Sequence, residues 1–300
     1  SATASIRVHA SPTVTLASIT DRCLDAGVLT LTGGLPSGGS YSGSGVSGSN
    51  FTPLTAGSGA HTIMYTYTDG NSCTDSASTT TQVDSLPVAT FSTLSNVCAN
   101  GSSITLSQGS ASPSGGTGTY LGTGVSGTSF SPSSVGVGTY NLGYAYVDNN
   151  GCRDTAYSNQ KVDTVPIVTF SALSSVCSNS GTFSLTNGAP MGGTYSGSGI
   201  TGSTFNPSSV TAGTDTLTYT YQDGNSCSDS AKQTIVVNAA PTVTLASISD
   251  RCLDAAVLSL TGGLPTGGSY SGAGVSGSNF TPLIAGSGSQ TITYTYTDNN

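Results

Sequence analysis

The sequence predicts an all-β fold, a tandem array of immunoglobulin-like β-sandwich repeats of about 75–79 residues that form an elongated rod. The first observation behind this prediction is strict alternation in residues 61–68, where Ile63, Tyr65 and Tyr67 fall on one side of an extended chain. The second is recurrence, because the pattern returns at Leu142/Tyr144/Tyr146, Leu217/Tyr219/Tyr221 and Ile292/Tyr294/Tyr296. The third is composition: 41 glycines, 12 prolines and only 7% charged residues favour short strands joined by tight turns.

Each repeat begins at a proline, namely Pro12, Pro87, Pro166 or Pro241. The spacings 87 − 12 = 75, 166 − 87 = 79 and 241 − 166 = 75 set the repeat lengths. The predicted domains are the last strand of a preceding repeat (1–11), repeat 1 (12–86), repeat 2 (87–165), repeat 3 (166–240) and a truncated repeat 4 (241–300). Repeats 1 and 4 share 50 of 60 aligned positions, which places a longer period of 241 − 12 = 229 residues over the single repeat.

Repeat 1 illustrates the expected elements. Strands are expected at about residues 13–18, 28–32, 39–42, 50–53, 61–68 and 76–83, with a short extra strand between Gly45 and Ser49. The expected core consists of Val14, Leu16, Leu29, Leu31, Tyr41, Phe51, Ile63, Tyr65 and Tyr67. Repeat 2 has 79 − 75 = 4 additional residues, which we expect to lengthen the turn around residues 109–118 without changing the strands.

The junctions between repeats are short. Only Asp84-Ser85-Leu86-Pro87 separates the last expected strand of repeat 1 from the first of repeat 2. Proline restricts its own backbone and that of the residue before it. A junction of this kind leaves little room for hinging, so the repeats are expected to form a stiff rod rather than loosely connected beads.

Cysteines recur at two per complete repeat, at Cys23, Cys73, Cys98, Cys152, Cys177, Cys227 and Cys252. No Cys-x-x-Cys motif is present, and the only histidines that could complete a zinc site are His9 and His61. The pattern therefore predicts disulfides that form in an oxidising compartment.

Chain direction indicates how the cysteines pair. If the chain enters a repeat at one end and leaves at the other, the first and last strands run the same way, and Cys23 and Cys73 lie at opposite ends, roughly 20–25 Å apart. A disulfide needs about 4.4–6.8 Å between Cα atoms. This favours the inter-repeat pairs Cys23–Cys152 and Cys98–Cys227, with Cys73, Cys177 and Cys252 bonded to partners outside the sequence. If the first strand is vestigial, the alternative is pairing within each repeat: Cys23–Cys73, Cys98–Cys152 and Cys177–Cys227.

The turns that carry the second cysteine of each repeat are candidate calcium sites. No other cofactor is expected. Their oxygen-bearing residues are Asp69, Asn71 and Asp75 in repeat 1, Asp148, Asn150 and Asp154 in repeat 2, and Asp223, Asn225 and Asp229 in repeat 3. In the alternative interpretation, Asp and Asn form these turns by bonding to the backbone. All 14 acidic residues are Asp, so no Glu is present as a bidentate ligand, and the second interpretation is favoured.

No constellation of catalytic residues is found, so the sequence predicts a non-enzymatic protein. No Gly-x-Ser-x-Gly elbow is followed by a strand-to-helix pattern, and His61 is replaced by Gln290 in repeat 4. The net charge of −8, with only six Lys and Arg, excludes a nucleic-acid-binding surface. No apolar run has the length of a membrane span.

Residues 193–199, 204–207 and 216–227 of repeat 3 carry a resemblance to a known family. Their order of motifs, G-G-x-Y-S-G, F-x-P and Y-T-Y-x-D-x-N-x-C, resembles the tandem immunoglobulin-like (PKD-like) repeats of giant surface proteins secreted by Bacteroidota, including the SprB-type gliding adhesins. The resemblance extends over every repeat. It implies export by the type IX system and an extracellular location at the cell surface, on the exterior of the bacterial outer membrane.

In that phylum, O-glycans are attached at Asp-Ser or Asp-Thr followed by an apolar residue. The resemblance therefore implies glycosylation first at Ser76, Thr155 and Ser230, which recur in register. Further matches to the same pattern are Ser85, Thr164 and Thr216.

Two functions are compatible with these features. One is a structural stalk or filament segment of a secreted cell-surface adhesin, which extends an adhesive tip and bears force in adhesion and gliding motility. The alternative is a multivalent array that binds polysaccharide or another surface. Such an array needs a recurring exposed aromatic platform, whereas alternation assigns the tyrosines to the core and tryptophan is absent, so the stalk is favoured. The expected partners are neighbouring repeats of the same chain, laterally associated copies, and an extracellular surface contacted by other parts of the protein.

Overall fold

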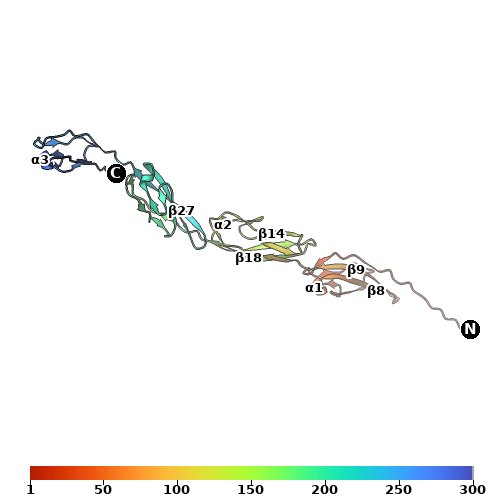
Figure 1. Cartoon of the computed structure of the whole chain (residues 1–300). Coiled ribbons are helices and arrows are strands. Elements are labelled where there is room, and N and C mark those ends of the chain that lie inside the picture. Colours follow the sequence, from red (N-terminus) through yellow and green to blue (C-terminus); the bar gives the residue numbers. More distant parts are fainter. Residues whose placement is uncertain (299–300) are drawn as a thin grey trace. The chain divides into compact units, whose positions relative to one another are not determined.

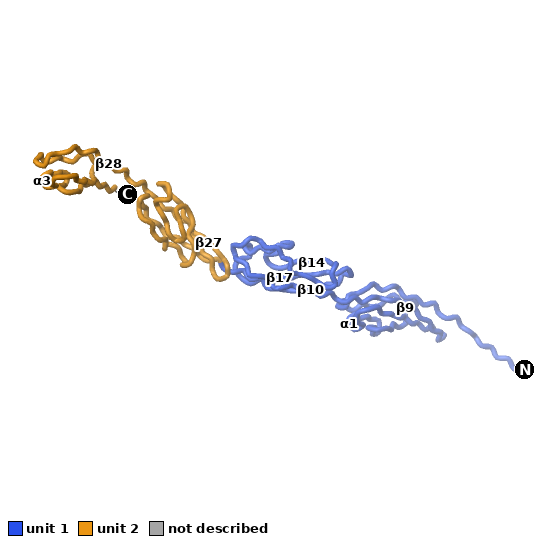
Figure 2. Tube along the Cα trace, viewed as in Figure 1, with its two compact units in different colours: residues 1–164 blue, residues 165–300 orange. Residues whose placement is uncertain are grey.

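The computed structural model describes residues 1–298 and consists of β-sandwich repeats with very little helix (Figure 1). The chain divides into two compact units, Ser1–Thr164 and Val165–Asn300 (Figure 2). Unit 1 contains repeats 1 and 2, and unit 2 contains repeats 3 and 4. The predicted all-β fold of immunoglobulin-like repeats is confirmed. No helix within residues 1–298 is long and apolar enough to cross a lipid bilayer.

Repeats 1 and 2 have the same order of elements. Those of repeat 1 are β1 (Thr15–Leu16), β2 (Arg22–Cys23), β3 (Leu29–Thr30), β4 (Gly34–Leu35), β5 (Ser40–Ser42), β6 (Val46–Ser47), β7 (Asn50–Phe51), α1 (Pro53–Ala56), β8 (Gly59–Thr68) and β9 (Thr74–Asp84). Those of repeat 2 are β10 (Val88–Phe91), β11 (Val97–Cys98), β12 (Ile104–Thr105), β13 (Gly109–Ser112), β14 (Thr117–Leu121), β15 (Val125–Ser126), β16 (Ser129–Phe130), α2 (Pro132–Val135), β17 (Gly138–Val147) and β18 (Arg153–Asp163).

Repeat 3 follows the same order. Repeat 4 follows it as far as residue 298, except that Arg251 and Cys252, the counterparts of β2, form no strand. The elements of repeat 3 are β19 (Thr169–Phe170), β20 (Val176–Cys177), β21 (Phe183–Ser184), β22 (Gly188–Ala189), β23 (Thr194–Ser196), β24 (Ile200–Thr201), β25 (Thr204–Phe205), the 3₁₀ turn η1 (Pro207–Ser209), β26 (Gly213–Gln222) and β27 (Ser228–Asn238). Those of repeat 4 are β28 (Thr244–Leu245), β29 (Leu258–Ser259), β30 (Gly263–Leu264), β31 (Ser269–Ser271), β32 (Val275–Ser276), β33 (Asn279–Phe280), α3 (Pro282–Ala285) and β34 (Thr293–Thr295).

Three sheets make up each complete sandwich. In repeat 1 their strand orders are β2-β9-β8-β5, β3-β7-β6 and β1-β4. β8 and β9 form a long antiparallel hairpin whose register runs from Gly59↔Val83 to Thr68↔Thr74. β2 pairs with the end of β9 in parallel, with Cys23 opposite Asp84. The strand that carries Cys23 therefore runs in the same direction as the last strand of the repeat.

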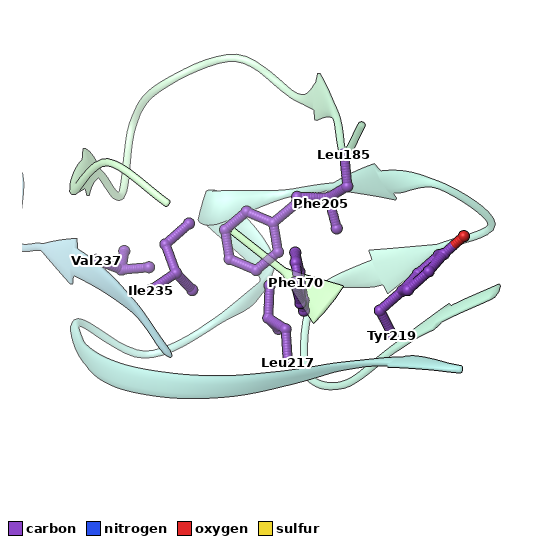
Figure 3. Close-up of a cluster of buried hydrophobic side chains, with 7 residues drawn as sticks. All are labelled: Phe170, Leu185, Phe205, Leu217, Tyr219, Ile235 and Val237. Carbon is purple, nitrogen blue, oxygen red and sulfur yellow. The ribbon is translucent and has the colours of Figure 1, made fainter. Parts of the chain in front are cut away.

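The core of each repeat lies between these sheets. In repeat 3 the buried side chains come from both layers, as Figure 3 shows for Phe170, Leu185, Phe205, Leu217, Tyr219, Ile235 and Val237. In repeat 1 the corresponding cluster is Leu31, Phe51, Ile63 and Val83. Alternation along β8 and β27 therefore predicts which face is buried, because successive side chains of a strand point to opposite faces.

The expected core of repeat 1 is largely observed. Val14, Leu31, Phe51, Ile63 and Tyr65 are buried, and Leu16, Leu29 and Tyr41 are half-buried. Tyr67 is only half-buried and lies outside the core cluster. The physical reason is that β5 pairs only with Met64 to Thr66, so Tyr67 has β9 on one side and no strand on the other. The placement of Tyr67 in the core was therefore wrong.

Sequence reasoning missed several short elements. β2, β4 and the helical turn α1 were not expected, whereas β6 corresponds to the expected extra strand between Gly45 and Ser49. α1 begins with Pro53, which suits the first helical position because its backbone has no N–H. Residues 1–11, expected as the last strand of a preceding repeat, form no strand, and the side chains of Ile6 and Val8 are 91% and 87% exposed.

The additional residues of repeat 2 extend its strands, which corrects the expectation of a longer turn. β10 pairs with β13 over four residue pairs, whereas β1 pairs with β4 over two. β14 pairs with β17 over five residue pairs, whereas β5 pairs with β8 over three. The four additional residues lengthen paired strands instead of forming a loop. In a paired strand, the backbone N–H and C=O groups of these residues are hydrogen-bonded to the neighbouring strand.

Candidate functional site

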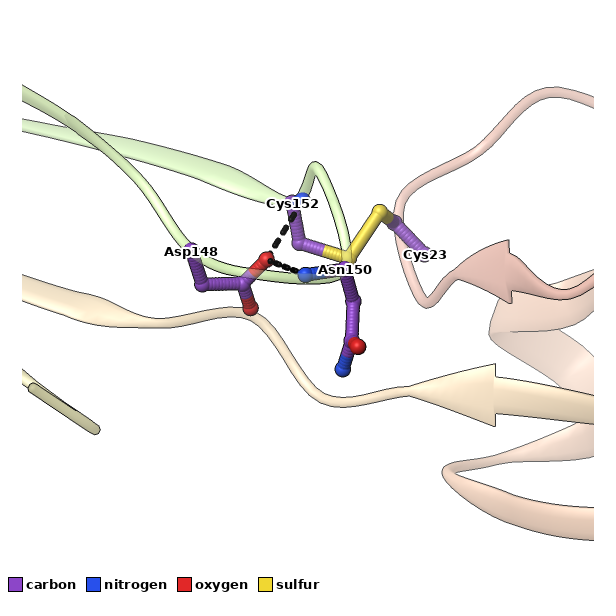
Figure 4. The surroundings of a disulfide bond; sticks show 4 residues. All are labelled: Cys23, Asp148, Asn150 and Cys152. Atoms are coloured by element: carbon purple, nitrogen blue, oxygen red, sulfur yellow. Dashed lines mark hydrogen bonds between the residues drawn. A yellow bond between two sulfur atoms is a disulfide. The ribbon is translucent and has the colours of Figure 1, made fainter. Parts of the chain in front are cut away.

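The candidate site is a disulfide between two successive repeats of unit 1. The Cys23 and Cys152 sulfur atoms are bonded, and their Cα atoms lie 5.6 Å apart. Cys23 ends β2 of repeat 1, and Cys152 lies between β17 and β18 of repeat 2 (Figure 4). This is the first of the two inter-repeat pairs that chain direction favoured, and it excludes both Cys23–Cys73 and Cys98–Cys152.

The turn that presents Cys152 is built by Asp148. Its Oδ1 accepts hydrogen bonds from the backbone N–H of Asn150 at 2.9 Å and of Cys152 at 2.8 Å (Figure 4). The Asp148 N–H in turn donates to the Cys152 carbonyl at 2.9 Å. A short Asp side chain is suited to this turn, because its carboxylate reaches the backbone two to four residues further along the chain.

The partner cysteine is held by the end of β9. Cys23 lies opposite Asp84 in the parallel pairing, and the next residue, Leu24, donates its N–H to the Asp84 carbonyl at 2.9 Å. Asp84 is also the last residue of β9, immediately before Ser85, Leu86 and Pro87. Cys23 is therefore located at the end of repeat 1 from which the chain leaves toward repeat 2.

Repeat 2 has a second anchor near its cysteine turn. The Ala89 N–H of β10 donates to Asp154 Oδ2 at 2.8 Å, and Asp154 Oδ1 accepts from the Thr155 N–H at 2.8 Å. Both carboxylate oxygens of Asp154 are thus used within repeat 2. The bond to Ala89 fixes the first strand after the junction to the start of β18, two residues beyond Cys152.

The remaining cysteines occupy equivalent positions in the other repeats. Cys98 and Cys227 are each disulfide-bonded, and the pairing Cys98–Cys227 stays a prediction. Cys73 and Cys252 are free cysteines, half-buried and exposed respectively. Cys177 ends β20 and is half-buried. The bonds of Cys73, Cys177 and Cys252 to partners outside the sequence likewise stay predictions.

In the cysteine turns that were candidates for calcium, the carboxylates bond to the backbone. Asp69 Oδ1 accepts from the N–H groups of Asn71 and Cys73, and Asp223 Oδ1 accepts from those of Asn225 and Cys227. The following aspartates turn to their own neighbours, because Asp75 and Asp229 accept from the N–H of Ser76 and Ser230. Within residues 1–298, no three His, Cys or Asp side chains are grouped as metal ligands. The carboxylates accept hydrogen bonds from backbone N–H groups, as in the alternative interpretation.

Hydrogen bonds to the carboxylate lower the pKa of Asp69 below its ordinary value of 3.8, first through the Cys73 N–H and then through the Asn71 N–H. A lowered folded-state pKa means that the turn contributes stability above the unfolded value and loses it as pH falls through the folded value. We expect exchange protection of the turn between β8 and β9 to fall as pH drops below about 4. We expect Asp69→Asn to weaken that dependence, measured by hydrogen-exchange mass spectrometry at matched intrinsic rates.

The control for this experiment is Asp25→Asn, which changes an exposed aspartate of the same repeat. That variant should retain the pH dependence of the unchanged protein in the turn between β8 and β9. Equal pH profiles for the unchanged protein and Asp69→Asn would contradict the role assigned to the Asp69 carboxylate.

A second local constellation, missed from the sequence, is a tyrosine that binds the turn before β5. The Tyr65 hydroxyl donates to the Pro36 carbonyl at 2.6 Å and accepts from the Gly39 N–H at 2.7 Å. Its ring also packs on Tyr41, with 4.7 Å between the centroids. The Tyr41 hydroxyl accepts from the Gly34 N–H at 2.9 Å. The two tyrosines thus satisfy backbone groups of β4 and of the turn that follows it.

This tyrosine–turn contact recurs, but its register shifts in repeat 2. Tyr219 binds Pro190 and Gly193, and Tyr294 binds Pro265 and Gly268 in the same way. In repeat 2 the hydroxyl that binds Pro113 and Gly116 belongs to Tyr146, two residues further along the strand than the aligned Tyr144. The longer β13 and β14 carry the turn one pleat further, so the next tyrosine on the same face reaches it. The signal in the sequence was the Pro-x-Gly-Gly segment that precedes β5, β23 and β31.

The candidate glycosylation sites lie on strands and junctions. Ser76 on β9, Ser230 on β27 and Thr216 on β26 are exposed, as are Ser85 and Thr164 beyond the ends of β9 and β18. Thr155 on β18 is half-buried. Five of the six hydroxyl-bearing residues are therefore accessible to modification.

Comparison with known proteins gives similarities at the level of solved structures. A Ca²⁺-stabilised adhesin that helps an Antarctic bacterium reach out and bind ice shares 15% identity over 95% of this chain and 88% of its own, with a TM-score of 0.38. A structure from a 1.5-MDa bacterial ice-binding adhesin has 14% identity and a TM-score of 0.31, and titin domains I67–I69 have 13% and 0.32; each covers 77% of this chain and 100% of the other. No family model matches, and no curated protein is similar in sequence.

Proposed function

We propose that this chain is a structural segment of a secreted cell-surface adhesin, a stalk that extends an adhesive tip from the cell and bears force in adhesion and gliding motility. The observation that carries the proposal is the Cys23–Cys152 bond, which joins two successive repeats beside a junction of only three residues between β9 and β10. Independent binding modules do not need a covalent bond that fixes one repeat to the next.

The two covalent connections between repeats 1 and 2 restrict rotation at the junction. One is the chain itself, through Ser85, Leu86 and Pro87, in which Pro87 is buried. The other is the disulfide, which starts at the residue paired with Asp84. A single flexible link permits bending and twisting, whereas two links at separate points oppose both. The proposed rod-like form of the stalk follows from repetition of this arrangement.

The proposed second bond of this kind is Cys98–Cys227. Both residues stand at positions equivalent to Cys23 and Cys152, one repeat later, and both are disulfide-bonded. An extracellular location on the exterior of the bacterial outer membrane is proposed with it, because disulfides of this number persist in oxidising surroundings. The stalk contacts an extracellular surface or polysaccharide through other parts of the protein.

Small-angle X-ray scattering of the oxidised chain tests the proposal. A compact globule of 300 residues would have a radius of gyration of about 19 Å. Four repeats placed end to end, each as long as a strand of ten residues, would span roughly 140 Å and give about 40 Å. A radius near the smaller value would contradict a stalk. Binding of the chain to polysaccharides on a glycan array would instead support the alternative of a multivalent binding array.

Glycosylation is proposed first at Ser76, Thr155 and Ser230. In protein isolated from its native cell surface, we expect glycan mass on the tryptic or chymotryptic peptides that contain these residues. Occupancy should be lowest at Thr155, because its side chain is half-buried while those of Ser76 and Ser230 are exposed. Intact-mass analysis that finds unmodified peptide at all three residues would contradict the proposal.

A further inference from the structure

Repeat 2 carries the one exposed aromatic side chain among residues 1–298. Tyr157 of β18 is 62% exposed, whereas every other tyrosine and phenylalanine of that range is buried or half-buried. The preceding residue, Ala156, packs against the core of the repeat. Because successive side chains of a strand point to opposite faces, Tyr157 lies on the outer face of the sheet.

The ring of Tyr157 lies over a glycine of the neighbouring strand. Gly143 of β17 is directly opposite Tyr157, and Leu121 of β14 is opposite Gly143 on its other side. A Cβ atom built at Gly143 would lie 3.1 Å from Cε1 and 3.4 Å from Cδ1 of Tyr157. One edge of the ring therefore covers Gly143, which is buried although it is on the outer face. The contact fixes the position of the ring and leaves the rest of it open to solvent.

Two amide side chains lie next to the ring on the same face. Asn141 of β17 and Asn159 of β18 are directly opposite each other, two residues along the strands from Gly143 and Tyr157, and both are exposed. Each amide has two N–H donors and a carbonyl acceptor. Directly opposed residues have Cβ atoms about 4.5–5.5 Å apart, so the two amides can bond to hydroxyl groups of one ligand.

The same face carries two of the six Lys and Arg residues of the chain. Arg153 and Lys161 of β18 are exposed and lie about 13 Å from Tyr157, one toward each end of the strand. Lys161 Nζ is 2.6 Å from Asp163 Oδ1, and a lysine ammonium has two further N–H donors. Of the residues of β14, β17 and β18 on this face, only Asp163 is acidic.

This combination distinguishes repeat 2 from the other two complete repeats. At the positions of Gly143 and Tyr157, repeat 1 has Met64 and Ser78, and repeat 3 has Thr218 and Lys232. Neither pair places an aromatic ring on the outer face. The same fold forms in all three repeats, so folding alone does not account for the exposed ring and the amides beside it.

We propose that the outer face of β14, β17 and β18 binds an acidic polysaccharide. The ring of Tyr157 stacks on the apolar C–H face of a pyranose, and Asn141 and Asn159 bond to hydroxyl groups beside it. Arg153 and Lys161 pair with carboxylates further along the polymer. The two cations are about 26 Å apart, so a ligand that reaches both is extended and carries repeated charges.

The local cations decide the charge of the ligand. The net charge of −8 belongs to a chain of 300 residues. At physiological ionic strength, exposed charges farther apart than about 8 Å are largely screened from each other. A carboxylate of the ligand therefore responds mainly to the arginine or lysine that it contacts, and little to aspartates elsewhere in the chain.

The polysaccharide site goes beyond the stalk function and does not depend on it. The stalk requires a fixed junction between repeats, whereas the polysaccharide site requires only the face of repeat 2. The site also differs from a multivalent array, because repeats 1 and 3 do not share it. Scattering tests the stalk and binding tests the site, so the two can fail separately.

Biolayer interferometry of the oxidised 300-residue chain on immobilised polygalacturonate and alginate, without divalent cations, tests the proposal. We expect binding to at least one of these polyuronates, weakening as sodium chloride is raised above 0.15 M. Their uncharged esters should not bind, and neither should polyaspartate, which has the charge without the sugar ring. Tyr157→Leu, which keeps an apolar cover over Gly143, should raise the dissociation constant about tenfold or more. Tyr157→Phe keeps the ring and should bind like the unchanged chain.

The charge contribution is measured with Arg153→Gln, because Lys161 also pairs with Asp163. This variant should raise the dissociation constant about two- to fivefold and reduce its dependence on salt. The matched control is Lys232→Gln, which removes a cation from the residue of repeat 3 aligned with Tyr157 and should leave binding unchanged.

Hydrogen exchange in repeat 2 separates binding from stability. Protection should be equal in Tyr157→Leu and Tyr157→Phe, while only the first loses binding. Asn159→Asp keeps the shape of an exposed side chain and adds a negative charge, so it should abolish binding independently of the ring. Three results would each overturn the proposal: no binding to either polyuronate, equal binding to the esters or to polyaspartate, and unchanged binding by Tyr157→Leu or Asn159→Asp.

Discussion

Reduction of the Cys23–Cys152 bond should lengthen the chain by roughly 430–460 Å when repeats 1 and 2 are unfolded by force. The bond closes a loop over a sequence separation of 129 residues, and an extended chain spans about 3.3–3.6 Å per residue. While the bond is intact, the residues inside the loop cannot contribute to the extension. Atomic force spectroscopy with and without a phosphine reductant measures the difference directly.

The measurement is best made with Cys98→Ser and Cys227→Ser present, because both cysteines are disulfide-bonded and would add a second constraint. In that background, the further change Cys23→Ser with Cys152→Ser should give the longer extension at once and no response to reductant. Equal extensions in oxidised and reduced protein would show that the bond does not carry the load between the repeats.

The same bond should contribute to equilibrium stability. Closing a loop of this length lowers the entropy of the unfolded chain, which corresponds to about 4–5 kcal/mol in the chain-entropy model. We therefore expect denaturant unfolding of repeats 1 and 2 to occur at a clearly lower midpoint after reduction. A change in the force-extension curve without a change in midpoint would assign the bond a mechanical role alone.

The second large effect is expected for Gly39→Ala. A Cβ atom at this position would overlap the Thr66 carbonyl oxygen and lie 2.6 Å from Tyr65 Cζ. Neither neighbour can withdraw, because Thr66 is in the β8 ladder and the Tyr65 hydroxyl is fixed by Pro36 and Gly39. We expect a loss of about 3 kcal/mol in the stability of repeat 1, in the range known for overpacked cores. Hydrogen-exchange mass spectrometry resolves this loss repeat by repeat.

Gly27→Ala is the matched control in the same repeat. Apart from the adjacent residues of the chain, nothing lies within 4 Å of a Cβ built at Gly27, so we expect a change within about 0.5 kcal/mol. Similar protection of repeat 1 in the Gly39→Ala and Gly27→Ala variants would show that the turn before β5 relaxes freely, and would contradict the fixed tyrosine–turn contact.

The long hairpins could be predicted from the sequence, whereas the short strands could not. β8 was expected over residues 61–68 and spans Gly59–Thr68, because an alternating run with Tyr at every second position is typical of a half-buried strand. β2 and β4 have only two residues each, and each forms only because it pairs with a strand elsewhere in the sequence. β2 pairs with Val83 and Asp84 of β9. β4 pairs with Thr15 and Leu16 of β1. Local pattern carries no information about such pairing.

The site followed from the sequence to the extent that it depended on chain direction. Only one consideration, that Cys23 and Cys73 lie at opposite ends of a repeat, was needed to favour Cys23–Cys152. The tyrosine–turn contact did not follow, because the hydroxyl of Tyr65 reaches a turn almost thirty residues earlier in the chain. In repeat 2 the partner is Tyr146 and not the aligned Tyr144, so alignment between repeats would have identified the wrong residue.

The parallel pairing of β2 with β9 determines how tension is distributed within repeat 1. A pull from repeat 2 reaches β9 through the chain after Asp84 and reaches β2 through the sulfur of Cys23, which lies opposite Asp84. Both adjacent strands are then drawn in the same direction at paired residues, so little relative sliding arises between them. Peeling of the last strand, which would expose Val83 and open the core, is opposed as long as the load is shared.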